Sequence, residues 1–185
     1  LDGDRLERPD LAARAWNEVL SRDPKNVFVL DALGRLYRKT SSFKELSVVM
    51  RRQLALEVNL SGQVNLLYEL ANLAEETLSD KILAAQCYAE IIERKPEDTN
   101  AIRFLGRVLS ETERYPELAT LVGREIQLAQ GRGAIEEALE LMVRLGRLKL
   151  TRLGDPRGAL SQYQEVLRLK PAHAGAIGAL EEMAR

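Results

Sequence analysis

A pattern of three residues recurs along the chain at long range and constrains the fold more than any other feature. A small residue stands four positions before an aromatic residue and twelve before a proline in three segments: Ala12, Trp16 and Pro24; Ala84, Tyr88 and Pro96; and Ala159, Tyr163 and Pro171. This spacing predicts a helix that packs closely on a neighbour and then stops near the proline. Because the prolines are 72 and 75 residues apart, we interpret the chain as an array of stacked repeats without a single central core.

The composition is that of a folded, near-neutral protein. Of 185 residues, 45% are hydrophobic and 30% are charged, and the formal net charge is -1. A disordered chain is less hydrophobic, and a protein built to hold nucleic acid carries a basic excess. No run approaches the roughly 20 consecutive apolar residues of a membrane-spanning helix. We therefore expect no nucleic-acid partner and no membrane insertion.

The lack of a targeting signal favours a cytoplasmic location, and the start at Leu1 suggests a fragment of a longer protein.

A shorter register divides each long repeat into two helical hairpins. A leucine followed by a small residue recurs at Leu33-Gly34, Leu70-Ala71, Leu105-Gly106 and Leu145-Gly146, with separations of 37, 35 and 40 residues. Each pair lies within an apolar pattern of helical period. The predicted helices cover residues 8–22, 27–39, 43–58, 62–77, 80–94, 99–111, 115–130, 134–152, 156–169 and 173–184. The predicted fold is all-α, with antiparallel helices joined by short turns.

Polar residues stand at several of the predicted helix starts. Ser42 and Glu45 have the spacing of a capping box, in which the serine side chain accepts an amide hydrogen bond. Asp155 precedes a proline at the first helical position. Three further residues are expected to accept amide hydrogen bonds at helix starts: Asn26, Asp98 and His173.

Two glycines of the shorter register are expected to allow close approach between helices. Gly34 and Gly106 lie within apolar helical patterns, where a side chain would meet the next helix. We expect that enlarging either glycine would push two helices apart, because overpacking of this kind costs about 1–3 kcal/mol.

The chain resembles the tetratricopeptide repeat family, in a diverged array of bacterial or scaffold type. The residues that carry the resemblance are Leu33, Gly34 and Tyr37 in a first helix, and Ala84, Tyr88, Pro96, Ala159, Tyr163 and Pro171 in second helices. Leu46 and Leu118 depart from the family pattern, which places a small residue there. The resemblance implies one right-handed α-solenoid over residues 1–185, with about four full hairpins and an unpaired helix at each end. The long units would cover residues 9–80, 81–155 and 156–185.

The resemblance also implies a concave wall formed by the solvent-facing sides of the first helices. The predicted rows are Phe28, Asp31, Arg35 and Arg38; Asn65, Tyr68, Asn72 and Glu75; Asn100, Arg103, Arg107 and Ser110; and Glu140, Val143, Arg147 and Leu150. Arg35, Asn72, Arg107 and Arg147 occupy equivalent places on successive hairpins and form a predicted ladder of hydrogen-bond donors.

Guanidinium groups pair well with carboxylates, so an extended acidic segment or a C-terminal carboxylate is the predicted ligand of this ladder. The candidate partner-binding residues are Phe28, Arg35, Arg38, Tyr68, Asn72, Asn100, Arg103, Arg107 and Arg147. The alternative is a solvated face whose charges balance locally, since Asp31, Glu75 and Glu140 interrupt the arginines. Tyr68 stands where the family's carboxylate-gripping pattern has lysine, so recognition of chaperone tails is not implied.

The sequence offers no constellation for catalysis, so we predict neither an enzyme nor a cofactor. His173 is the only histidine and Cys87 the only cysteine, and they lie in different hairpins, which excludes a zinc site built from them. Gly131-Arg132-Gly133 lacks the lysine and the strand of a phosphate loop and is interpreted as a helix connector. Paired glutamates such as Glu136 and Glu137 are adjacent on a helix and point apart.

The leading functional prediction is a scaffold that binds a protein or peptide. A second prediction is a self-assembling element, since exposed apolar residues of the terminal helices would pair between chains. The residues concerned are Leu6, Leu11, Trp16, Ile177, Leu180 and Met183. An RNA-binding helical array is disfavoured by the near-neutral charge.

Overall fold

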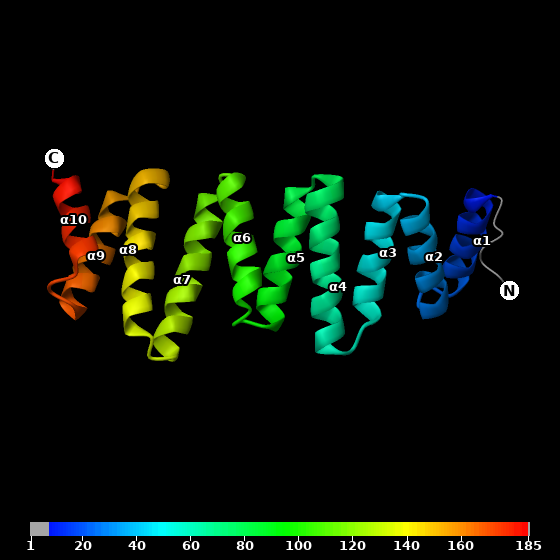
Figure 1. The fold of residues 1–185 in the computed structure, drawn as a ribbon, viewed down its shortest axis with the longest axis horizontal. Coiled ribbons are helices and arrows are strands. Elements are labelled where there is room, and N and C mark those ends of the chain that lie inside the picture. Colours follow the sequence, from blue (N-terminus) through cyan, green and yellow to red (C-terminus); the bar gives the residue numbers. More distant parts are fainter. Residues whose placement is uncertain (1–7, 185) are drawn as a thin grey trace. The chain divides into compact units, whose positions relative to one another are not determined.

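The computed structural model describes residues 8–184, and this part of the chain is built from helices (Figure 1). The elements are α1 (Pro9–Arg22), α2 (Val27–Lys39), α3 (Phe43–Leu56), α4 (Leu60–Asn72), a π-helical segment (Leu73–Leu78), α5 (Lys81–Arg94), α6 (Thr99–Glu111), α7 (Tyr115–Gly131), α8 (Ile135–Arg152), α9 (Pro156–Leu169) and α10 (Ala174–Met183). The predicted all-α fold of antiparallel hairpins is confirmed, and each helix lies within a few residues of its predicted range. Across residues 8–184, none of the helices has both the length and the apolar character to cross a membrane.

The chain divides into two compact units, one up to Ala101 and the other from Ile102 onward, with the boundary inside α6. In the first unit α1 packs on α2, α2 on α3, α3 on α4, and α4 on α5. In the second unit α7 packs on α8, α8 on α9, and α10 on both α8 and α9. Within each unit these helices thus bury their apolar sides mainly against neighbours in sequence, as expected of a repeat protein.

The repeated small and aromatic residues occupy the core of each unit. Ala84 and Ala159 are fully buried, and Tyr88 and Tyr163 are 2% and 1% exposed. In the first copy of the pattern Ala12 is buried, and Trp16 packs at the edge of a cluster that includes Leu20. All three helices end two residues before their proline, at Arg22, Arg94 and Leu169, so the sequence pattern marks both the packing face and the helix end.

Polar residues cap four of the helices as predicted. The amides of Val29, Ala101 and Ala176 donate to Asn26 Oδ1 at 3.1 Å, Asp98 Oδ1 at 3.1 Å and His173 Nδ1 at 3.4 Å. Asp155 Oδ1 accepts from the Gly158 amide at 2.8 Å.

The capping box predicted at Ser42 is wrong. The Ser42 side chain accepts no amide hydrogen bond at the start of α3. Its Oγ lies 2.9 Å from Thr40 Oγ1 instead. The intervening Ser41 adopts a positive φ of 54°. The tight turn therefore pairs the two hydroxyl groups with each other, which removes the Ser42 side chain from the helix start.

The prediction that a side chain at Gly34 or Gly106 would push two helices apart is also wrong. A third glycine, Gly146, occupies such a position. A Cβ added at Gly34 would lie 3.8 Å from Val49 Cγ1, and one at Gly106 would lie 3.7 Å from Leu121 Cδ2, which are ordinary contacts. A Cβ at Gly146 would lie 2.5 Å from Tyr163 Cε1. The difference follows from the neighbour, because Gly146 faces the ring of Tyr163, whereas Gly34 faces Val49 and Gln53 and Gly106 faces two leucines.

The C-terminal end of the fourth predicted helix widens into the π-helical segment, which the sequence analysis did not predict. Ala74 within it is fully buried, and its carbonyl accepts from the Asp80 amide at 2.8 Å. The segment ends at Ser79, whose φ is 53°. Glu75 in the same segment accepts a hydrogen bond from the Tyr88 hydroxyl at 2.8 Å, which joins the end of this helix to α5.

Candidate functional site

The predicted partner-binding residues of α2 lie on its exposed side in the first unit. Phe28 is 67% exposed, and its ring meets Trp16 edge-on with centroids 6.2 Å apart. Arg35 is exposed about two turns further along the helix. Arg38 forms an exposed ion pair with Glu69 of α4, at 3.0 Å between Nη2 and Oε2. Local charge balance therefore exists at Arg38, as the alternative interpretation of this face predicted.

Tyr68 of α4 supports the structure around the start of α6. Its hydroxyl donates to Asp98 Oδ1 at 2.6 Å, and its ring packs edge-on against Tyr88 at 6.2 Å between centroids. Burial and the bond to Asp98 raise the pKa of Tyr68. Burial opposes ionisation of Asp98, yet hydrogen bonds from Tyr68, Ala101 and Lys95 outweigh it and hold the Asp98 pKa below its usual value. One carboxylate thus joins the α4 tyrosine, the preceding turn and the α6 amides.

Two predicted arginines of α6 in the second unit lie against one aromatic ring. The guanidinium carbon of Arg103 is 4.9 Å from the centroid of Phe104, and that of Arg107 is 5.9 Å from it. Arg107 also pairs with Glu111 at 3.5 Å within the helix. Both arginines are exposed. Contact with a ring face restrains the position of a guanidinium group.

The remaining candidates are also at the surface, with one correction. Asn72 of α4, Asn100 of α6 and Arg147 of α8 are exposed. Val143, placed in the solvent-facing row of α8, is only 7% exposed. Its Cγ1 lies beside Gly175 of α10. That assignment was wrong because α10 packs on α8 and covers this side of the helix.

The predicted donor ladder falls in both units, with Arg35 and Asn72 in the first and Arg107 and Arg147 in the second. Within each unit the two side chains are exposed on first helices of their hairpins. A continuous ladder across the chain remains a prediction.

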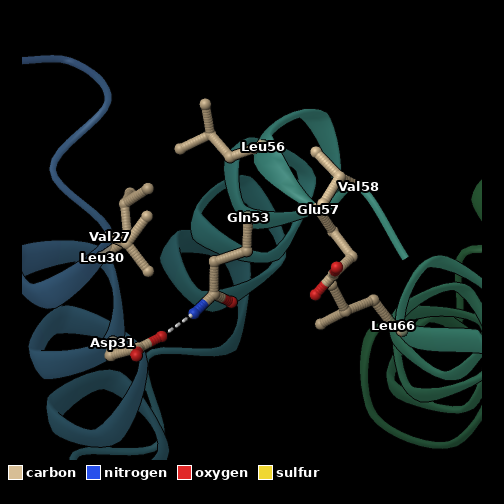
Figure 2. A pocket seen from close by; sticks show the side chains of 9 residues that line it. Val27, Leu30, Asp31, Gln53, Leu56, Glu57, Val58 and Leu66 are labelled. Carbon is tan, nitrogen blue, oxygen red and sulfur yellow. Dashed lines mark hydrogen bonds between the residues drawn. The ribbon is translucent and has the colours of Figure 1, made fainter.

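A hollow that the sequence analysis missed lies between α2, α3 and α4 of the first unit (Figure 2). We call it the α2–α4 hollow; its volume is about 350 Å³. Its aliphatic lining is Val27, Leu30, Leu56, Val58 and Leu66. Three polar side chains also line it: Asp31, Gln53 and Glu57. Figure 2 shows Val27, Leu30 and Asp31 on one side, Glu57, Val58 and Leu66 on the other, and Gln53 and Leu56 between them.

The polar groups of the α2–α4 hollow are held by two short hydrogen bonds. Gln53 Nε2 donates to Asp31 Oδ1 at 2.7 Å, and the Asn59 amide donates to Glu57 Oε1 at 2.8 Å. Two valines at its rim are unusually exposed, Val27 at 56% and Val58 at 93%. The sequence signal for this hollow is a valine at each of two helix boundaries, Val27 and Val58. The periodicity of helix faces does not identify residues at such boundaries.

The residues considered for catalysis are engaged in the structure. Cys87 is buried, and burial raises the pKa of its thiol to about 11, so little of it is ionised at neutral pH. His173 is 5% exposed and uses Nδ1 as an acceptor at the start of α10. Within residues 8–184, no three histidine, cysteine, aspartate or glutamate side chains are grouped to hold a metal ion.

Comparison with known proteins finds similarity to solved structures only. No family model and no curated protein sequence matches the chain. The structure of YrrB, described as a TPR protein with an unusual peptide-binding site, is 17% identical, with a TM-score of 0.42 over 94% of this chain and 84% of that one. MamA is 19% identical, with a TM-score of 0.42 over 86% of this chain and 81% of that one. PilF of Pseudomonas aeruginosa is 17% identical, with a TM-score of 0.40 over 94% of this chain and 74% of that one.

Proposed function

We propose that this chain is a protein-interaction scaffold that binds a peptide or folded partner on the exposed sides of its first helices. A helical repeat array presents long rows of side chains on a rigid support, which suits recognition of an extended segment. The observation that supports the proposal most strongly is the pair of exposed arginines on α6, which share the ring of Phe104. Their geometry is restrained before any partner arrives, so less conformational entropy is lost on binding.

The ligand that fits this surface is an acidic segment or a C-terminal carboxylate. Arginine binds carboxylates with two parallel hydrogen bonds. The pair of Arg107 with Glu111 does not prevent this, because an exposed pair four residues apart in a helix contributes only about 0.3–0.5 kcal/mol. A partner carboxylate is therefore able to replace Glu111. Arg147 on α8 is a further exposed arginine of the second unit and a further candidate donor.

The test is binding of a fluorescent peptide that ends in Asp-Glu-Glu, measured by anisotropy at two salt concentrations. We expect the double variant Arg103→Glu with Arg107→Glu to weaken binding about tenfold or more, and higher salt to weaken binding to the native chain. Arg157→Glu is the matched control, since Arg157 is an exposed arginine of α9 in the same unit. If the double variant and Arg157→Glu weaken binding equally, or if neither of them weakens it, the acidic-ligand proposal is contradicted.

Self-association is a second candidate, supported by exposed apolar residues on the terminal helices. Leu11 of α1 is 48% exposed and Ile177 of α10 is 39% exposed. Leu6 lies outside the described residues, and Trp16 contributes to the core cluster of its own unit. Sedimentation at increasing protein concentration tests this candidate. A constant monomer mass for the native chain, or a mass shift that Ile177→Asp leaves unchanged, removes the proposed role of α10.

A further inference from the structure

We propose that the α2–α4 hollow is a separate binding site, which takes one aliphatic side chain of a partner peptide flanked by lysine or arginine. The site lies within the first unit and has a chemistry opposite to that of the arginine surface on α6. It therefore goes beyond the acidic-ligand proposal and does not depend on it.

The size and lining of the hollow select the aliphatic side chain. Its volume of about 350 Å³ is near the lower end of the roughly 300–1,000 Å³ of ligand pockets. That space suits one side chain with its adjoining backbone. Leu30 on one side of it is fully buried, whereas Val27 and Val58 are 56% and 93% exposed. A leucine-sized group would cover the apolar surface of these two valines, which now faces water.

The charge of the hollow selects the flanking residues. Asp31 and Glu57 stand on opposite sides of it (Figure 2), and none of its lining residues is basic. Each carboxylate accepts one neutral hydrogen bond through a single oxygen. Among residues 8–184, no lysine, arginine or histidine forms an ion pair with either carboxylate. A lysine or arginine on each side of the inserted side chain would complement both charges, while acidic flanks would be repelled.

The probe is a fluorescein-labelled peptide containing Lys-Leu-Arg between glycines, titrated with the whole chain at low ionic strength. Matched peptides contain Glu-Leu-Glu or Lys-Ala-Arg. We expect Lys-Leu-Arg to bind with the highest affinity, Lys-Ala-Arg about tenfold more weakly, and Glu-Leu-Glu more weakly still. The comparison of Lys-Leu-Arg with Lys-Ala-Arg measures the contribution of the aliphatic contact. The comparison of Lys-Leu-Arg with Glu-Leu-Glu measures the contribution of the flanking charges.

Two conservative substitutions locate the binding to the hollow. Asp31→Asn and Glu57→Gln keep the acceptor atoms that bind Gln53 and Asn59, and each is expected to lower affinity for Lys-Leu-Arg about twofold to fivefold. Glu97→Gln removes an exposed carboxylate elsewhere in the first unit and is expected to leave affinity unchanged. Circular dichroism melting curves of all variants verify that the fold is retained.

A third substitution tests the same site by adding charge. Val58→Lys places a cation at the most exposed rim position and is expected to weaken binding of Lys-Leu-Arg. The double variant Arg103→Glu with Arg107→Glu is expected to leave this binding unchanged, which separates it from the acidic-ligand proposal.

Three binding results overturn the proposal. They are undetectable binding of Lys-Leu-Arg, equal affinity for Lys-Leu-Arg and Glu-Leu-Glu, and affinity that Asp31→Asn with Glu57→Gln leaves unchanged. Dimerisation of the native chain that this double variant abolishes also overturns it, because the occupant would then be a second copy of the chain.

Discussion

The strongest quantitative prediction concerns Gly146, where α8 meets the ring of Tyr163. The Cβ of Gly146→Ala would lie 2.5 Å from Cε1, 2.8 Å from Cζ and 3.1 Å from Cδ1 of that ring. The ring is 1% exposed, so it cannot move into solvent, and the two helices must separate or the ring must leave its rotamer. Overpacking of this kind costs about 1–3 kcal/mol.

The cost at Gly146 is partly offset by helix propensity. Replacing glycine with alanine inside a helix stabilises it by about 0.8–1.0 kcal/mol. Because three ring atoms lie within 3.1 Å of the new carbon, we take the upper part of the overpacking range and expect a net loss of about 1–2 kcal/mol. Gly106→Ala in the same unit has only ordinary contacts, at 3.7 Å and 3.9 Å. It is expected to stabilise the chain by up to about 1 kcal/mol.

The assay is urea unfolding of the native chain and both variants, followed by far-ultraviolet circular dichroism. The informative quantity is the difference between the two glycine substitutions, which share chemistry, helix context and unit. Tyr163→Leu supplies a second comparison, since Gly146→Ala is expected to cost less when the ring is absent. The reasoning is refuted if Gly146→Ala and Gly106→Ala change stability alike, or if the cost at Gly146 persists in the Tyr163→Leu background.

Two further predictions concern Asp98 and Cys87. Asp98→Asn is expected to destabilise the chain by about 1 kcal/mol at neutral pH, because the carboxylate caps α6 and accepts from Tyr68. The folded pKa of Asp98 is lowered, so its stabilisation is present above its unfolded pKa of about 4 and is lost as the pH falls through the folded value. The stability difference from Asp98→Asn, followed by urea unfolding, should therefore shrink below about pH 4; a difference independent of pH would contradict this. The Cys87 thiol, with a pKa of about 11, is expected to react with an aromatic disulfide reagent many times more slowly in the folded chain than in urea, and equal rates would show that it is accessible.

The boundaries of the helices could be predicted because their signals are local. A proline two residues beyond α1, α5 and α9 fixes where each ends, and side-chain acceptors such as Asn26 and Asp155 fix where others begin. Ser42 shows the limit of this reasoning, since its hydroxyl pairs with that of Thr40 and does not cap α3.

The distances between helices could not be predicted, because sequence periodicity identifies a face without identifying what lies opposite it. Gly34, Gly106 and Gly146 are equivalent in sequence, yet only the third meets an aromatic ring at close range. Val143 and Arg147 share a predicted solvent face, but the packing of α10 on α8 buries only the first. The α2–α4 hollow was missed for the same reason, since it depends on how three helices diverge.

The hydrogen bond from Tyr68 to Asp98 makes the start of α6 depend on an earlier helix. The cap of α6 is held by a residue of α4, and His173, the cap of α10, lies 3.4 Å from Glu140 of α8. In both cases an earlier first helix supports the beginning of a later one, while the cap of α2 at Asn26 is braced by its own turn through Asp23. Removal of α10 would leave the bond between Tyr68 and Asp98 complete but would uncover Val143 of α8. Removal of the chain through α4 would leave Asp98 without Tyr68, so the start of α6 is expected to depend on the presence of α4.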